Sequence, residues 1–330
     1  MTLIPIEAPE DFALAEKFVR LYEITSVSLA GLVRRKSENL FFISKLGEGE
    51  IPRKPEDLFG LIDFDTTIYH CIPQYELLNQ DEFFVQIKPL IKKAVRCISG
   101  ESKATDFLVN VLSNFTESEM LPDVKLTNVR KFTPKQSNYY KMMKFGTPRT
   151  DASLTNQSSK SQNDGNSTET QKSPTKNQNS LITAPTLFNG DQIIRCTEND
   201  MEILAPLQKE YMKEEVAFPG RQITDAEVSM MLRQILKNQL CFALVSDGEL
   251  VAKANTNAIG FGCIQIGGVF THPLFRRNGY AAALILELCR RTIKTNRLPV
   301  LFVKEKNMPA FTLYQKLGFT ECGHYQIVYY

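Results

Sequence analysis

The sequence predicts a mixed α/β fold, an α+β mixed sheet, in two separate parts. Three observations carry this prediction. Strand-like and helical runs alternate at both ends of the chain, a polar stretch separates them, and a strand-like run near the C-terminal end enters a glycine turn that opens a helix. We therefore expect an N-terminal mixed α/β domain at 1–145, a flexible polar linker at 146–188 and a second domain at 189–330.

Composition narrows the class of protein. A length of 330 residues suits two domains, and a net charge of +2 gives no support for nucleic-acid binding. Seven scattered cysteines and three dispersed histidines indicate neither disulfides nor a metal centre, and they fit a reducing cytoplasm. No apolar run approaches the roughly 20 residues of a membrane span, and the N-terminus lacks the basic start of a signal peptide. We expect a cytoplasmic protein without membrane or metal.

The N-terminal part has the pattern of a small α/β domain. An apolar face with helical spacing runs from Phe12 to Tyr22, and a second apolar stretch ends at Val33. Alternating patterns predict strands and helices beyond it. The expected strands are 39–46, 58–72, 98–101 and 124–132, and the expected helices are 83–95 and 105–112.

Between the two parts, the run 155–180 contains no apolar side chain and is dominated by Ser, Asn, Gln, Thr and Lys. Such a segment cannot bury enough surface to offset its ordering entropy, so it is expected to be a spacer. A regulatory segment with Ser173 as a phosphate acceptor is the alternative.

In the C-terminal part, Thr224 is expected to cap a helix, Pro206 to break or restart another, and Gly318 to end a third. Gly260, Gly262, Gly267 and Gly268 make the approach to the strand 262–271 glycine-rich and suggest a bulge or close ligand approach. The expected strands are 192–196, 240–245, 250–256, 262–271, 299–303, 319–321 and 325–330, and the expected helices are 200–216, 224–236, 281–295 and 308–317.

The turn at 276–281 predicts an anion site. The first N–H groups of a helix have no internal acceptor, and the helix dipole adds partial positive charge there. Arg276 and Arg277 contribute further charge, and Gly279 lets a ligand approach the backbone closely.

Two motifs give this turn a context. Residues 276–281 read Arg-x-x-Gly-x-Ala, with Pro273 before them. An asparagine, a tyrosine-bearing helix and a Gly-Phe pair follow at Asn307, Ala310, Tyr314, Lys316, Leu317, Gly318 and Phe319. Together with the element order, these motifs resemble the GCN5-related N-acetyltransferase (GNAT) family over 191–330, and the resemblance implies a GNAT fold.

The resemblance implies acetyl-CoA, or another short acyl-CoA, as co-substrate. The N–H groups of 277–281 would bind its pyrophosphate, and the strand before the turn would offer backbone groups to the pantetheine arm and the thioester. The cofactor residues so assigned are Val269, Phe270, Thr271, Arg276, Arg277, Asn278, Gly279, Tyr280, Ala281, Asn307 and Tyr314.

The resemblance also assigns Tyr314 as the catalytic acid that protonates the departing thiolate of CoA; a core aromatic is the alternative reading. Asn307 either contacts the cofactor or only caps its helix. The general base stays open among Glu214, Glu215 and Glu305, each of which also fits a surface charge.

The N-terminal part loosely resembles a degenerate GNAT-like domain, on the strand 98–101 and its following helix, with Asn128, Arg130 and Gln136 beyond. It lacks both the Arg-x-x-Gly-x-Ala turn and the Tyr/Gly-Phe ending, so a tandem copy would have lost acyl-CoA binding. It would then serve as a scaffold, a wall of the substrate cleft or a sensor. An unrelated α/β domain is the alternative.

We therefore expect an N-acetyltransferase that transfers an acyl group, acetyl first, to a primary amine by direct attack in a ternary complex. No cysteine ends the motif strand to suggest an acyl-enzyme. The acceptor is either a small molecule or a protein. A non-catalytic acyl-CoA sensor that gates the N-terminal domain is the alternative, and a nucleic-acid-associated acetyltransferase is a third, weaker one.

Overall fold

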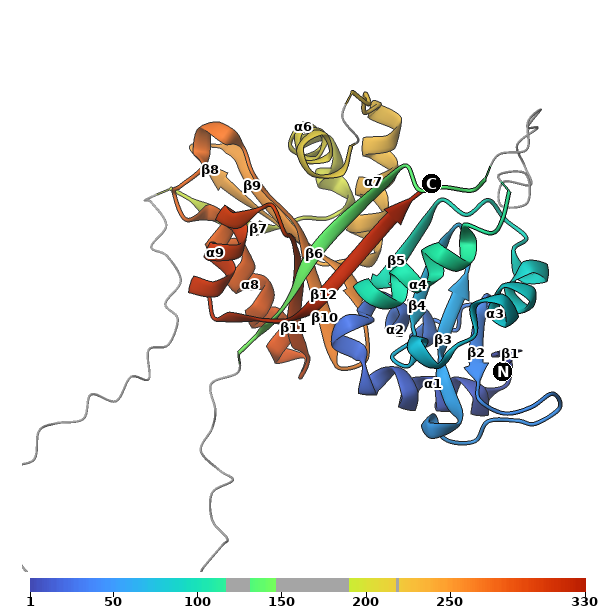
Figure 1. Ribbon diagram of the computed structural model, residues 1–330. Helices are drawn as coiled ribbons and strands as arrows, with labels where there is room; N and C mark the ends of the chain where they lie inside the picture. Colours follow the sequence, from blue (N-terminus) through green and yellow to red (C-terminus); the bar gives the residue numbers. More distant parts are fainter. Residues whose placement is uncertain (117–130, 147–189, 218–219) are drawn as a thin grey trace, which may run out of the picture.

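A single mixed sheet of twelve strands runs through the described part of the protein, with helices on its faces (Figure 1). The computed structural model describes residues 1–116, 131–146, 190–217 and 220–330. The mixed α/β prediction is confirmed. Within these ranges no helix is both long and apolar enough to span a membrane.

The first half contains six strands and four α-helices among the described residues. The strands are β1 (Thr2–Pro5), β2 (Leu40–Ser44), β3 (Leu58–Phe64), β4 (Thr67–Cys71), β5 (Cys97–Glu101) and β6 (Gln136–Phe145). The helices are α1 (Pro9–Leu21), α2 (Val27–Arg34), α3 (Gln80–Ile87) and α4 (Ser102–Leu112). The expected strand at 124–132 and most of the expected linker lie outside the described residues.

The second half also contains six strands and four α-helices among the described residues. The strands are β7 (Gln192–Arg195), β8 (Cys241–Ser246), β9 (Glu249–Ile259), β10 (Cys263–Thr271), β11 (Leu298–Lys304) and β12 (Phe319–Tyr329). The helices are α6 (Met201–Tyr211), α7 (Asp225–Asn238), α8 (Tyr280–Lys294) and α9 (Met308–Lys316), and a π-helical turn, Met212–Val216, continues α6.

The two halves repeat one element order. Each runs strand, two helices, three strands, helix, strand, helix, strand. Each also holds one parallel pair, β4 with β5 and β10 with β11, while the other strand pairs are antiparallel. The first half is therefore a structural counterpart of the second.

The last strands of the two halves are exchanged. The sheet order is β1-β2-β3-β4-β5-β12-β6-β11-β10-β9-β8-β7. Thus β6 pairs with β11 of the second half, and β12 pairs with β5 of the first, while β6 and β12 lie side by side (green and red in Figure 1). Although β6 precedes the expected linker in the chain, in space it lies among the strands of the second half.

Four local expectations need correction. The expected strand 58–72 is a hairpin of two strands, β3 and β4, and the expected helix 83–95 ends as α3 at Ile87, two residues before Pro89. Pro206 lies inside α6 and does not break it. A proline removes one N–H, and the carbonyl that loses its helical partner belongs to Glu202, an exposed residue that water can solvate. The two expected final strands form one strand, β12, because a bulge between Glu321 and Gly323 absorbs the irregular sequence.

A buried carboxylate joins the halves outside the sheet. Glu23, just after α1, is 5% exposed and accepts hydrogen bonds from the backbone N–H groups of Gly262 (2.9 Å) and Cys263 (3.0 Å) at the start of β10. These donors compensate the burial of the charge. Val27 of α2 packs nearby with Ala258 and Cys263 of the second half.

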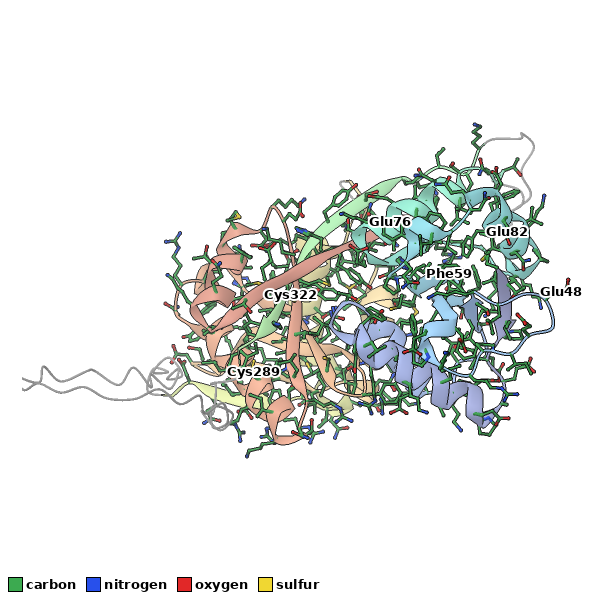
Figure 2. All side chains as sticks on the ribbon, turned by 60° about the horizontal axis from the view of Figure 1, so that its bottom comes forward. Glu48, Phe59, Glu76, Glu82, Cys289 and Cys322 are labelled. Carbon is green, nitrogen blue, oxygen red and sulfur yellow. The ribbon has the colours of Figure 1, made fainter. Side chains whose placement is uncertain are left out.

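In the first half, a histidine covers the neighbouring strand where β4 and β5 end. The buried ring of His70 lies against Gly100 and places Nε2 2.8 Å from Oγ1 of Thr105 on α4. Burial lowers the pKa of His70 to about 3, so the ring is neutral at neutral pH. Glu76 and Glu82 lie at the approach to α3 and in its first turn (Figure 2), so acidic groups stand where the second half has its basic turn.

The contact of His70 with Gly100 predicts a size limit at that glycine. A methyl group at Gly100 would lie 2.1 Å from His70 Nε2. We expect Gly100→Ala to lower the free energy of unfolding by about 1–3 kcal/mol, measured by urea denaturation. Gly47→Ala is the control, because its added carbon would meet nothing closer than 3.6 Å. The double variant with His70→Ala should recover part of the loss, and equal stability of the two glycine variants would contradict this contact.

Candidate active site

A cavity of about 1440 Å³ opens where β10 and β11 diverge. The two strands pair in register from Cys263 opposite Leu298 to Ile266 opposite Leu301. Beyond that point they line opposite sides of the cavity, which extends from the turn before α8 to β6 and β12. A parallel pair that separates in this way exposes backbone N–H and C=O groups to a ligand.

The turn before α8 has the geometry of an anion site. Arg277 (φ 69°) and Gly279 (φ 80°) both adopt the left-handed conformation, and Gly279 is the N-cap of α8. The first helical hydrogen bond runs from the N–H of Ala283 to the Gly279 carbonyl at 3.0 Å. The N–H groups before Ala283 at the start of the helix therefore have no helical acceptor and can converge on an anion.

The two arginines of the turn differ in their surroundings. The guanidinium of Arg276 donates to the Thr271 carbonyl (3.0 Å) and to both carboxylate oxygens of Glu214 (2.9 and 2.7 Å). Its side chain thus ties the turn to the π-helical end of α6. Arg277 is exposed and makes no ion pair with the described residues, so its charge is available at the turn.

The expected bulge forms at the glycine pair of β10. The register with β9 shifts between Gly267 and Phe270, and Gly268 has φ 57°. A side chain at Gly268 would lie 1.9 Å from Oδ1 of Asn255, so this position requires glycine. Val269 directly follows the bulge glycine and lines the cavity.

A buried lysine supports the bulge from β9. Nζ of Lys253 donates to the Gly268 carbonyl at 3.0 Å and to Asn255 Oδ1 at 3.3 Å, and it lies 4.6 Å from the ring centroid of Tyr211. Burial lowers the pKa of Lys253 to about 8. Sequence reasoning missed this residue; a lysine between alanines in an apolar strand was the only local signal.

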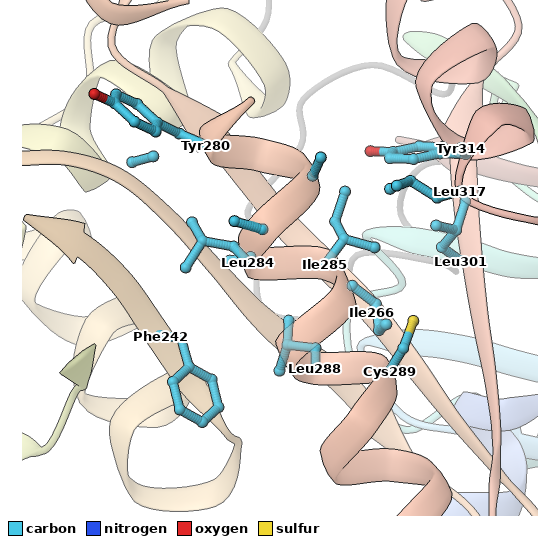
Figure 3. Close-up of a cluster of buried hydrophobic side chains, with 14 of the residues drawn as sticks. Phe242, Ile266, Tyr280, Leu284, Ile285, Leu288, Cys289, Leu301, Tyr314 and Leu317 are labelled. Carbon is cyan, nitrogen blue, oxygen red and sulfur yellow. The ribbon is translucent and has the colours of Figure 1, made fainter. Parts of the chain in front are cut away.

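Tyr314 lies at the opposite wall, on α9. It is 7% exposed, lines the cavity, and its hydroxyl makes no hydrogen bond with the described residues. Burial raises the pKa of Tyr314, and the charge of Glu215 adds to this effect. In Figure 3, Tyr314 lies beside Leu317 and Leu301, while Tyr280 lies on the other side of α8.

Two more predicted residues have mainly structural contacts. The Tyr280 hydroxyl lies 3.2 Å from Ser246 Oγ and 3.4 Å from Asp191 Oδ1, so its ring anchors α8 and only its backbone suits a ligand. Asn307 Oδ1 accepts from the N–H of Ala310 (3.2 Å), which makes it the N-cap of α9. All the predicted cofactor residues except Asn278 line the cavity.

The three candidate bases are now distinguishable. Glu214 pairs with Arg276, and Glu305 is exposed and pairs with His324. Glu215 lines the cavity with its side chain 25% exposed, and its carboxylate lies 3.2 Å from Lys304 Nζ. Glu214 also lines the cavity but is exposed and tied to the turn, so Glu215 is the less exposed of the two cavity carboxylates.

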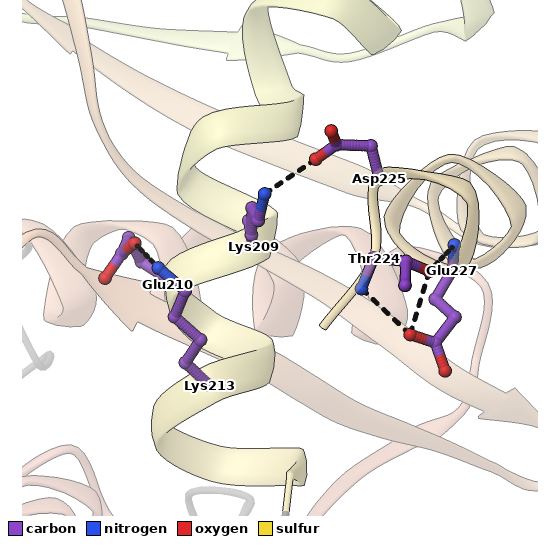
Figure 4. Close-up of polar contacts among 6 residues, drawn as sticks. All are labelled: Lys209, Glu210, Lys213, Thr224, Asp225 and Glu227. Carbon is purple, nitrogen blue, oxygen red and sulfur yellow. Dashed lines mark hydrogen bonds and ion pairs between the residues drawn. The ribbon is translucent and has the colours of Figure 1, made fainter. Parts of the chain in front are cut away.

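Helix α7 holds α6 in place above the cavity. Thr224 caps α7 as predicted, and the Glu227 carboxylate accepts a hydrogen bond from the Thr224 N–H at 2.9 Å (Figure 4). Lys209 of α6 forms an ion pair with Asp225 of α7 at 2.7 Å. The two helices also share a buried apolar cluster that contains Leu204, Val228 and Leu232, and this packing holds the end of α6, from which Tyr211 and the π-helical turn reach the cavity.

Sequence reasoning missed the far wall of the cavity. This wall is formed by side chains of β11 and of the exchanged strands β6 and β12: Phe302, Tyr140, Ile327 and Tyr329. No local signal marks them, because β6 was not predicted and its place between β11 and β12 depends on the exchange.

The buried ammonium of Lys253 predicts a pH dependence of stability. The folded protein releases this proton near pH 8, whereas the unfolded chain holds it to about 10.5. The unfolded state therefore binds more protons between these values, and wild type should gain stability relative to Lys253→Met by roughly 3 kcal/mol across that window. Urea denaturation from pH 7 to 10 measures this gain. Lys237→Met, at an exposed position, is the control, and a difference independent of pH would refute the assignment.

Comparisons with known proteins give a family match within the second half. Residues 205–319 match the family model described as Acetyltransferase (GNAT) family. A search of curated protein sequences finds no match.

Solved structures share the fold across the chain. An acetyltransferase from the GNAT family of Colwellia psychrerythraea is 10% identical, with TM-score 0.50, over 100% of this chain and 99% of that one. A Drosophila protein is 10% identical, with TM-score 0.55, over 99% and 98%. A GNAT-family structure from Novosphingobium aromaticivorans is 17% identical, with TM-score 0.38, and the match covers 59% of this chain and 65%, less than two thirds, of that one. The predicted resemblance is confirmed over the residues that the family model covers: the chain has a GNAT-like fold, and residues 205–319 match the acetyltransferase (GNAT) family.

Proposed function

We propose that the protein is an acyl-CoA-dependent N-acyltransferase that transfers an acetyl group from acetyl-CoA to a primary amine. One observation carries the proposal: a single cavity connects the anion site at the start of α8 with the Tyr314 hydroxyl, through the diverging ends of β10 and β11. Acyl-CoA needs a phosphate site and an extended channel that meet at a thioester, and this cavity has that form.

Donor binding follows from the backbone. The free N–H groups at 277–281 and the side chain of Arg277 bind the pyrophosphate. Arg276, held by Thr271 and Glu214, keeps the turn in shape. The pantetheine arm lies along Val269, Phe270 and Thr271, whose backbone groups have no β11 partner. An N–H of this edge can accept the growing charge on the thioester oxygen.

The chemistry is a direct transfer in a ternary complex. The neutral amine nitrogen attacks the thioester carbonyl carbon, the C–N bond forms, and the carbonyl oxygen becomes an oxyanion. Collapse of this intermediate breaks the C–S bond, and Tyr314 donates its proton to the sulfur. Glu215 takes the proton from the amine nitrogen, through a water molecule where they do not touch. Because burial raises the pKa of Tyr314, its hydroxyl stays protonated at neutral pH.

The acid role of Tyr314 predicts a turnover defect. Tyr314→Phe keeps the ring but removes the proton, so kcat should fall roughly 10²-fold, while the Kd for acetyl-CoA should stay unchanged. Thiol release from acetyl-CoA across a panel of primary amines measures kcat, and calorimetry measures Kd. The control is Tyr139→Phe, at a tyrosine that is 47% exposed. Wild-type turnover by Tyr314→Phe would make the tyrosine a core aromatic only.

The phosphate site predicts a loss of donor binding. Gly279→Trp forces a bulky side chain onto a backbone at φ 80° at the mouth of the turn, which should abolish acetyl-CoA binding and turnover. Gly248→Trp tests a glycine with nearly the same conformation, φ 84°, in the hairpin between β8 and β9, and should retain binding. Acetyl transfer by Gly279→Trp at the wild-type rate would contradict the proposed phosphate site.

A further inference from the structure

Where the cavity meets β6, β11 and β12, its lining is largely aromatic. We define the aromatic wall as Tyr140 of β6, Phe302 of β11, and Ile327 and Tyr329 of β12, with Tyr211 of α6 above them. In the sheet register, Tyr140 lies opposite Lys304 on one side and Tyr325 on the other, which puts it at the centre of this surface. Tyr140 is partly buried, and this burial raises the pKa of its hydroxyl.

The charges near this wall are already paired. Lys304 is bound to Glu215 at 3.2 Å, so it does not offer a free cation to an acceptor's carboxylate or phosphate. The other cations that line the cavity are exposed, and one of them, Arg276, is paired with Glu214; the rest are Arg277, Lys306 and Lys316. An acceptor at the wall therefore meets aromatic surface along its body and one carboxylate, Glu215, at its amino group.

We propose that the acceptor is a small primary amine with an aromatic or branched apolar body. Its body packs on Tyr140, Phe302 and Tyr329, and its amino group lies at Glu215, facing the thioester. Ring contacts and apolar burial favour such a body over a hydrophilic one. This inference rests on the proposed transferase function and deepens it by naming the substrate class.

The strand exchange makes both halves part of this acceptor site. Tyr140 comes from the first half and Ile327 from the second, and each lies on the last strand of its half. Without β6, the wall loses its central ring and β11 loses a neighbour in the sheet. The first half thereby acts as a wall of the substrate cleft, although its own counterpart of the cofactor turn carries acidic residues.

The test compares two adjacent tyrosines. Tyr140→Ala removes the central ring of the wall, while Tyr139→Ala removes the next side chain on the same strand, which is 47% exposed and does not line the cavity. With acetyl-CoA as donor, kcat/KM is measured for phenylethylamine, isoamylamine, ethanolamine and a lysine-containing peptide. We expect wild type to favour the two apolar amines, and Tyr140→Ala to lower kcat/KM for phenylethylamine about tenfold, mainly through KM. Tyr139→Ala should leave kcat/KM for phenylethylamine unchanged, and neither variant should change the KM for acetyl-CoA.

A second variant guards against a folding defect. Ile327→Ala, on the other exchanged strand, should also raise the KM for phenylethylamine, and thermal melting shows whether each variant is folded. The inference is overturned, with the transferase function intact, if wild type prefers the peptide or ethanolamine, or if the two tyrosine variants behave alike. An effect confined to the KM for acetyl-CoA would assign the wall to the donor and overturn it too.

Failure of the transferase function itself gives a different result. In that case no amine is acetylated. Calorimetry of phenylethylamine binding to the CoA-saturated protein then tests the aromatic wall directly. Binding that weakens in Tyr140→Ala but not in Tyr139→Ala supports the acceptor wall, and no binding to wild type overturns it.

Discussion

The backbone hydrogen bonds of β6 are the interaction on which the rest of the structure depends. This strand lies between β11 and β12, and β12 in turn pairs with β5, so one ladder joins the two halves into a continuous sheet. Unpaired backbone groups at a buried edge are costly, and removing β6 would expose two such edges at once. Neither half is therefore complete without the last strand of the other, and the cavity lies where the exchanged strands meet the diverging pair β10 and β11.

Side chains decide which of two topologically equivalent halves can hold a ligand. In the first half, the His70 ring lies over Gly100 and reaches α4, and Asp81 and Glu82 occupy the first turn of α3. In the second half, the corresponding helix starts from Gly279 without an acidic residue in its first turn, and its strand carries the bulge at Gly268. Acid at a helix start repels a phosphate, whereas free N–H groups attract one. The same order of elements thus gives a smaller cavity of about 520 Å³, whose lining includes Glu76 and Asp106, in the first half and the larger cleft with free turn amides in the second.

The cleft of the second half is held by paired polar groups, some buried and some exposed. Buried Lys253 donates to the carbonyl of Gly268, Glu215 pairs with Lys304, and exposed Glu214 pairs with Arg276. Buried charge is costly without partners, so these contacts stabilise one arrangement of the bulge, the turn and the end of α6. They leave the Tyr314 hydroxyl, the amides of the turn and the remaining lone pairs of the Glu215 carboxylate as polar groups available to a ligand.

The sequence by itself determined the features whose physics is local. The cap at Thr224, the cap at Asn307 and the anion turn at 276–281 each depend on a few consecutive residues, and hydrophobic periodicity located most helices and strands. Only the tertiary structure decided the position of β6, because its burial alternates weakly along the strand and its partners lie far away in the chain. Three other features also depend on contacts between elements that are far apart in the sequence. They are the pairing of Arg276 with Glu214, the burial of Lys253 and the aromatic wall around Tyr140. Strand pairing joins residues without regard to their separation in sequence, so a local pattern cannot specify which strand lies next to which.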